Sequence, residues 1–216
     1  MTSLPSVVLD VWSHVAKSAS RVVVLPDGCR DLILRIPPGS PPQWFVSSLD
    51  DTAYSVERRA GEFFAGYRLR PGAVIDETVL LALVGDRNDP DVTRTLSLLD
   101  DCVSLDARIV EALDSLSNAS SVADATRQLG VSERSLERLV MMNTERTPSY
   151  WKNLARVRRA ARALPGLEPL AAIAADHGYT DQAHLSRDFQ RWFGTSPSLF
   201  RRSPDLHATV ADSGFC

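Results

Sequence analysis

Apolar residues recur at helical spacing in the C-terminal half of the chain, in two similar copies. The second copy spans residues 170–202. Its first helix is predicted by Leu170, Ile173 and Ala174, which fall on one helical face. This helix ends at His177, because Gly178 supplies the positive φ that commonly follows a helix.

A second helix follows the turn in this copy. Thr180 or Asp181 is expected to cap it, since a short side-chain oxygen accepts hydrogen bonds from the first free N–H groups. Leu185, Phe189 and Phe193 then recur at i, i+4 and i+8 and predict its buried face. The pattern indicates a helix, a tight turn and a second helix.

The first copy lies about fifty residues upstream, at residues 121–150. Its first helix is predicted over residues 123–129 and ends at Gly130, and Ser132 is expected to cap the next. The buried face of that next helix is expected to hold Leu136, Leu139 and Val140.

A single helix is predicted between the copies, over residues 148–164. It carries an apolar stripe and a separate basic stripe. At 1.5 Å per residue it would span roughly 25 Å, and successive major-groove faces of B-DNA lie about 34 Å apart. The apolar stripe consists of Trp151, Leu154, Val157, Ala161 and Leu164, and the basic stripe of Lys152, Arg156, Arg159 and Arg162.

This tandem arrangement over residues 106–202 resembles the DNA-binding domain of AraC-type transcriptional regulators. The resemblance implies seven helices with two helix-turn-helix units, each placing one recognition helix in the DNA major groove. By the spacing of the family's motif, the residues that meet DNA are Arg134, Glu137 and Arg138 in the first unit, and Gln182, Ala183, His184, Ser186 and Arg187 in the second. Phosphate contacts are further expected from Ser132, Lys152, Arg156, Thr180 and Arg191.

Charge separates the chain into two parts, although the whole sequence carries only −3. Residues 127–202 hold thirteen basic and seven acidic side chains, a net +6, whereas residues 1–105 hold ten and fourteen, a net −4. The basic part is suited to phosphate attraction, and the acidic part is expected to stay off the duplex.

The N-terminal half predicts short strands and turns. An amphipathic helix is expected at Val7–Val15, followed by a hairpin of Arg21–Pro26 and Asp31–Ile36 joined by a turn at Pro26, Asp27 and Gly28. Further strands are predicted at Trp44–Ser47, Tyr54–Arg58 and Glu62–Leu69, with a turn at Arg70, Pro71 and Gly72. The fold class is therefore α+β, a small and mostly antiparallel β domain followed by an all-α domain.

Two tracts of this half, PDGCRDLIL and FFAGYRLRPGA, resemble the short sensor-like domain of compact AraC-type regulators. That resemblance implies an effector pocket and names no ligand. The aromatic residues of the strands could line such a pocket, but side chains of this kind in short strands are more often core. The residues concerned are Trp44, Phe45, Phe63, Phe64 and Tyr67.

The expected limits are a sensor domain at 1–95, a linker at 96–105, a DNA-binding domain at 106–202 and a disordered tail at 203–216. Residues 96–116 also repeat apolar positions at helical spacing. Their stripe either packs on the DNA-binding domain or pairs with a second copy of the chain.

The sequence contains no Gly-rich phosphate loop, no HExxH motif and no GxSxG motif, so no known catalytic motif is predicted. Cys29, Cys102 and Cys216 lie far apart and are expected to be free thiols rather than metal ligands, and a self-methylating repair protein would need more cysteines. No membrane-spanning run or basic-then-apolar leader is present, so a cytoplasmic protein without a membrane partner is expected.

The sequence thus predicts a non-enzymatic transcriptional regulator with double-stranded DNA as its partner and no cofactor. Activation and repression both remain open, and RNA polymerase, a small-molecule effector and a second copy of the chain are the other partners considered. The alternative is a small-molecule or thiol-redox binding protein whose C-terminal domain mediates protein contacts. DNA affinity that falls steeply with salt would distinguish the regulator from this alternative.

Overall fold

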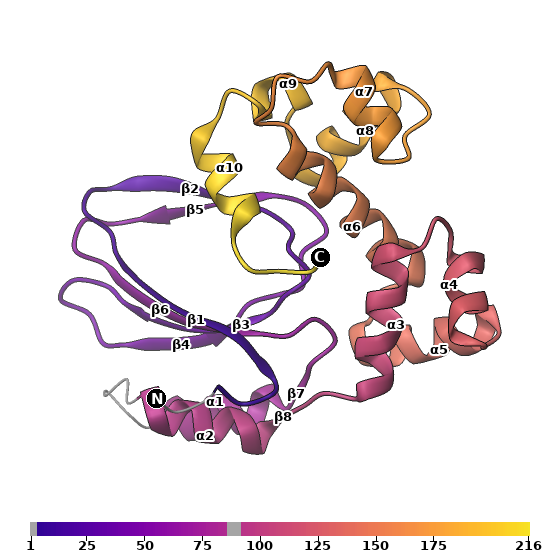
Figure 1. Cartoon of the computed structure of the whole chain (residues 1–216). Coiled ribbons are helices and arrows are strands. Elements are labelled where there is room, and N and C mark those ends of the chain that lie inside the picture. Colours follow the sequence, from indigo (N-terminus) through magenta and orange to yellow (C-terminus); the bar gives the residue numbers. More distant parts are fainter. Residues whose placement is uncertain (1–3, 86–91) are drawn as a thin grey trace.

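The computed structural model describes residues 4–85 and 92–216 and shows a β domain followed by a helical domain (Figure 1). The fold is α+β, as predicted. The strands are β1 (Val8–Val15), β2 (Ser20–Val24), β3 (Asp31–Ile36), β4 (Gln43–Val46), β5 (Tyr54–Arg58), β6 (Phe63–Leu69), β7 (Val74–Ile75) and β8 (Val103–Ser104). The helices are α1 (Glu77–Gly85), α2 (Val92–Cys102), α3 (Ala107–Asn118), α4 (Val122–Leu129), α5 (Glu133–Thr144), α6 (Pro148–Ala163), α7 (Leu170–Asp176), α8 (Gln182–Phe193), α9 (Pro197–Phe200) and α10 (Pro204–Ala211).

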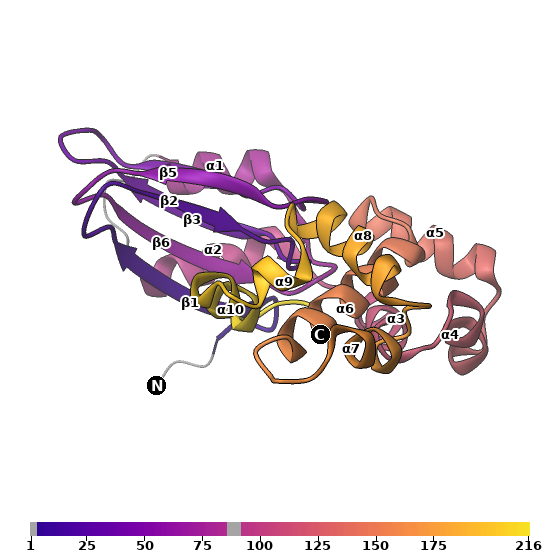
Figure 2. The ribbon, with the colours of Figure 1, turned by 90° about the horizontal axis from the view of Figure 1, so that it is seen from above.

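The β domain has three layers. An antiparallel sheet of order β1-β6-β3-β4 lies in the middle, the β2–β5 pair covers one face, and α1 and α2 cover the other (Figures 1 and 2). Leu32, Tyr67 and Leu69 of the sheet pack with Leu80 of α1 and Leu99 of α2 in one apolar core. Burying these side chains supplies most of the favourable free energy of the domain.

The predicted helix at Val7–Val15 is wrong, because Val8–Val15 is strand β1. It pairs with β6 along its whole length, from Val8 opposite Leu69 to Val15 opposite Phe63. The apolar residues of this nine-residue window fit both a helical and a strand period. Pairing with the distant strand β6 therefore determines that the segment is a strand.

The predicted hairpin of residues 21–36 is also wrong. β2 pairs with β5, and β3 lies between β4 and β6. The segment 25–30 therefore crosses from one sheet to the other and is not a hairpin turn. The predicted turn after β6 is confirmed, since the N–H of Ala73 donates to the carbonyl of Arg70 at 3.0 Å and Gly72 has φ +85°.

The helical repeat of residues 96–116 is divided between α2 and α3. Strand β8 interrupts it, and the side chain of Asp106 then caps α3 by accepting from the N–H of Arg108 at 2.9 Å. The stripe on α3, including Ile109, Leu113 and Leu116, is buried in the core of the helical domain. This stripe packs inside the chain and is not a surface for a second copy.

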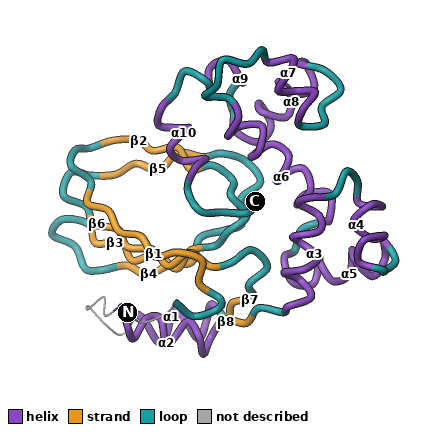
Figure 3. The backbone as a smooth tube through the Cα atoms, viewed as in Figure 1, coloured by secondary structure: helices purple, strands orange, loops and turns teal. Residues whose placement is uncertain are grey.

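Seven helices, α3 to α9, lie within the described residues 107–200, and α6 runs through their centre (Figure 3). Trp151, Leu154 and Val157 of α6 are fully buried among the helices around it. No described helix combines the length and the apolar character needed to cross a bilayer.

The expected disorder of residues 203–216 is wrong. Residues 204–211 form α10, which Ser203 caps, and the chain then turns back toward the β domain. Val210 and Phe215 are buried, at 1% and 6% exposure. Burial of these two apolar side chains stabilises the segment, although its mostly polar composition is typical of a disordered tail.

Candidate nucleic-acid interface

The first helix-turn-helix unit consists of α4 and α5. Gly130 ends α4 in the left-handed conformation, with φ +66°. The hydroxyl of Ser132 then accepts from the N–H of Ser135 at 3.2 Å and caps α5. Leu136 and Val140 are buried, so the opposite face of α5 is left to solvent. The cap and the buried face follow the prediction.

The second unit consists of α7 and α8. Gly178 has φ +71° in the turn, and the Asp181 carboxylate caps α8 by accepting from the N–H of His184 at 2.7 Å. Asp181 is thus the cap, and Thr180 is not. Phe189 and Phe193 lie 5.2 Å apart in an edge-to-face pair that anchors α8 to the core.

Most of the predicted DNA-contacting residues lie on the solvent-exposed faces of α5 and α8. Arg138 and Arg187 make no hydrogen bond or ion pair within residues 4–85 and 92–216, so their guanidinium groups are available to a ligand. The fully exposed set is Arg134, Glu137, Arg138, Gln182, Ala183 and Arg187.

Two predicted contacts on α8 are partly engaged within the protein. His184 is half-buried, and its ring packs edge-to-face on Tyr179 at 5.1 Å. The hydroxyl of Ser186 donates to the carbonyl of Gln182 at 2.9 Å.

The predicted phosphate contact of Arg156 does not agree with the structure. Its guanidinium donates to the Asp188 carboxylate of α8 at 2.7 Å and lies 4.4 Å from the Tyr179 ring. Both charged side chains are about 85% buried. This buried ion pair between α6 and α8 helps to fix the orientation of α8.

The other predicted phosphate contacts lie in different settings. Ser132 and Thr180 are exposed beside the N-termini of the recognition helices, and Arg191 is exposed with its guanidinium 5.5 Å from the Trp192 ring. Lys152 is half-buried, and burial, helped by the charge of Arg156, lowers the pKa of its ammonium group. Ser132, Thr180 and Arg191 are thus exposed to an approaching DNA backbone, although the Ser132 hydroxyl also caps α5 and the Thr180 hydroxyl lies 3.4 Å from Nδ1 of His184. Lys152 is less exposed.

A loop of the β domain, residues 47–53, contacts both units. Arg146, which follows α5, donates to the carboxylate of Asp51 at 2.8 Å and to the carbonyl of Leu49 at 2.6 Å. The N–H of Ala53 donates to the carbonyl of Trp192 on α8 at 2.8 Å. The β domain is therefore bonded to residues at the end of each recognition helix.

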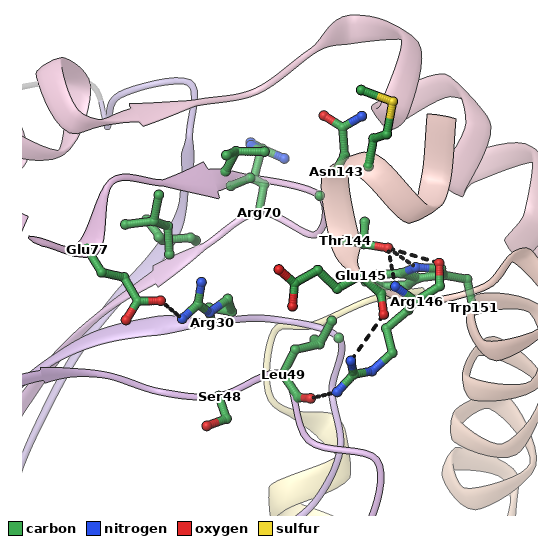
Figure 4. A pocket seen from close by; sticks show the side chains of 17 residues that line it. Arg30, Ser48, Leu49, Arg70, Glu77, Asn143, Thr144, Glu145, Arg146 and Trp151 are labelled. Atoms are coloured by element: carbon green, nitrogen blue, oxygen red, sulfur yellow. Dashed lines mark hydrogen bonds and ion pairs between the residues drawn. The ribbon is translucent and has the colours of Figure 1, made fainter. Parts of the chain in front are cut away.

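A cleft of about 400 Å³ lies between the β domain and the end of α5 (Figure 4). Arg30 pairs with Glu77 on one wall, and Arg146 and Glu145 form the other. Sequence reasoning gave no role to Arg146, because its partners lie nearly a hundred residues away in the chain.

A second cavity, of about 230 Å³, lies inside the β domain between the two sheets. Its walls are mostly apolar. Its lining includes the predicted Phe45 and Phe64 but not Trp44, Phe63 or Tyr67. The other apolar lining residues include Trp12, Val22, Val24, Ile33 and Val56, and the charged ones are Asp27, Asp31, Asp50, Arg58 and Arg68.

Cys29 also lines this cavity, but its thiol is not activated. The side chain is buried, and burial together with the negative charge of Asp27 raises the pKa of the thiol well above its usual value. A reactive cysteine needs a lowered pKa, so the thiol-redox alternative receives no support from this site.

Comparison with protein families matches residues 125–203 to a helix-turn-helix domain. The matched residues contain the turns of both units and all of α5 and α8. Residues 125–203 therefore form a helix-turn-helix domain of the AraC type. The matched domain family is one of DNA-binding transcription regulators.

Several solved structures are similar to parts or most of this chain. The C-terminal domain of AraT, a response regulator from Geobacillus stearothermophilus, is 23% identical over 45% of this chain and 85% of its own, with a TM-score of 0.42. A transcriptional regulator from Chromobacterium violaceum is 26% identical over 50% and 95%, with a TM-score of 0.41. ToxT from Vibrio cholerae is 9% identical over 89% and 97%, with a TM-score of 0.47. Comparison with curated proteins gave no match.

Proposed function

We propose that α5 and α8 enter two successive major-groove segments on one side of a DNA duplex. The observation that carries this proposal is the pair of capped recognition helices with exposed outer faces, joined by a central α6 of 16 residues. In this arrangement Arg138 and Arg187 anchor the helices or bind guanine. Residues Arg134, Glu137, Gln182, Ala183, His184 and Ser186 contribute to the choice of sequence.

Phosphate contacts come from exposed side chains on and beside the recognition helices. Ser132, Thr180 and Arg191 fit this role, and Arg156 does not, because Asp188 holds it. The proposal keeps the expected cytoplasmic location, because a DNA-binding regulator acts in the compartment that holds the DNA. Contact with RNA polymerase and homodimer formation stay predictions.

Salt dependence tests the proposal directly. If about four phosphates are neutralised by arginine or lysine side chains, DNA affinity should fall on the order of a hundredfold between about 50 and 200 mM salt, because each neutralised phosphate releases counterions. The measurement is a fluorescence-anisotropy titration on a promoter fragment that the protein protects from nuclease. A DNA affinity that does not change with salt concentration would favour a protein partner for the helical domain.

We further propose that the 230 Å³ cavity binds a small, largely apolar effector. Its apolar walls suit the body of such a molecule, and Asp50 and Arg58 offer polar contacts. The loops 25–30 and 47–53 line the cavity and also contact the helical domain. A bound effector can therefore influence the contacts between the two domains.

A thermal-shift screen of small metabolites tests the cavity. A ligand at a hundred times its Kd should stabilise the protein by about 2.7 kcal/mol and raise its Tm. Val56→Trp serves as the control, since the larger side chain fills the space between the sheets. A compound that stabilises this variant as strongly as the native protein binds elsewhere.

A further inference from the structure

Residues 213–216, called here the clasp, lie in a groove between the crossover 26–30 of the β domain and α6. Phe215 is the anchor of the clasp. Its ring packs edge-to-face on Trp151 at 4.9 Å, and its N–H donates to the carbonyl of Asp27 at 2.7 Å. One residue therefore contacts both domains.

Arg158 of α6 bonds the crossover of the β domain and the residues just before the clasp. It is fully buried and donates to the carbonyl of Pro26 at 3.2 Å, and to those of Val210 and Asp212 at 3.4 Å each. Three backbone oxygens, from the β domain and from the residues before the clasp, thus converge on one guanidinium. A guanidinium is costly to bury unless its donors are satisfied, and these carbonyls satisfy its two terminal nitrogens, whereas its Nε has no hydrogen-bond partner among the described residues.

Two glycines show how closely the clasp fits. A Cβ at Gly28 would lie 2.8 Å from the Cβ of Phe215 and 2.9 Å from the Trp151 ring. A Cβ at Gly214 would lie 2.8 Å from a terminal nitrogen of Arg158 and 3.0 Å from the carbonyl oxygen of Asp27. At Gly28 any side chain would have to displace the clasp or the Trp151 ring, and at Gly214 the Arg158 guanidinium would have to move.

The groove shares a wall with the cavity of the β domain. Arg68 lines that cavity and pairs with Asp31 through Nε and with Asp27 through a terminal nitrogen, both at 3.2 Å. Its other terminal nitrogen donates to the carbonyl of Ser213. The hydroxyl of Ser213 also donates to the Asp10 carboxylate at 3.1 Å. A single side chain thus connects the cavity to the clasp.

We propose that the groove is a peptide-binding site occupied by the clasp, and that Arg68 couples the cavity to it. An anionic group in the cavity would draw Arg68 away from Ser213 and loosen the clasp. The β domain would then be held less firmly against α6, the helix that connects the two recognition helices. The coupling rests on the proposed effector site, whereas the docking of the clasp does not.

Hydrogen exchange on the full chain tests the docking. Gly214→Ala should speed amide exchange by at least about tenfold at residues 27–30 and 213–216, because the new methyl group displaces the clasp, and leave α8 protected. Gly166→Ala is the matched control, since its Cβ would meet only the carbonyl of Ala163 at an ordinary 3.5 Å. Phe215→Ala should repeat the effect if Gly214→Ala fails to fold. Unchanged exchange in the folded variants would overturn the docking.

Arg68→Lys tests the coupling. Lysine keeps the charge but cannot bond Asp27, Asp31 and Ser213 together, so exchange at residues 213–216 should rise at least about threefold, although residue 68 does not touch Phe215. If amide exchange at residues 213–216 in Arg68→Lys equals that of the native protein, the proposed coupling is wrong, whereas the proposed docking of the clasp still stands. DNA affinity is measured in parallel. If the native protein and Gly166→Ala both fail to bind DNA, the proposed function fails, while the exchange result still judges the clasp.

Discussion

Replacing Arg187 by alanine should lower DNA affinity by about ten- to a hundredfold. Arg187 is exposed on α8 and free of ion pairs within the described residues, and a good base contact contributes about 1–3 kcal/mol. Arg138→Ala should have a similar effect through α5. The two losses should add, because the residues lie on different recognition helices and share no partner.

Gel shifts on a protected promoter fragment at fixed salt measure this effect. Arg59→Ala provides a matched control, since Arg59 is an exposed arginine of the β domain, and its affinity should stay within about twofold of the native value. Unchanged affinity in both Arg138→Ala and Arg187→Ala would show that the assigned faces of α5 and α8 do not contact DNA.

Trp151→Ala should destabilise the protein by about 3–5 kcal/mol, the range for removing a large buried aromatic side chain. The indole of Trp151 is fully buried at the start of α6, and its N–H donates to the hydroxyl of Thr144 at 3.0 Å. It also supports Phe215 of the clasp. The loss should appear as a lower denaturation midpoint in urea.

Two further variants separate the causes of this loss. Trp151→Phe keeps a ring and removes the N–H bond, so it should cost less, on the order of 1–2 kcal/mol. Leu167→Ala changes a fully exposed side chain and should stay within about 0.5 kcal/mol. A loss for Trp151→Ala no larger than that of Leu167→Ala would contradict the central role of this tryptophan.

The sequence predicted the helix-turn-helix units well because their signals are local. The caps at Ser132 and Asp181 and the glycines at 130 and 178 act within a few residues of where they stand, so no distant partner had to be known. The buried aromatic positions of α8 followed from helical spacing for the same reason.

The wrong predictions concern segments whose structure depends on contacts with residues far away in the chain. Val8–Val15 became a strand because β6, more than fifty residues later, pairs with it. Arg156 lies on a basic stripe and looked like a phosphate contact, but Asp188, 32 residues away, holds it inside. The cavity likewise combines residues from strands that no local pattern brings together.

The hydrogen bond from Ser213 to Asp10 joins residues 203 positions apart and has a consequence for folding during synthesis. The β domain and α6 are made before residues 213–216 leave the ribosome, so the groove first exists without its occupant. Trp151 and the backbone oxygens around Arg158 are then open to water or to chaperones. Docking of the clasp is consequently a late folding event. A nascent chain paused before residue 213 should therefore be more sensitive to proteases at the crossover 26–30 than a chain that includes the clasp.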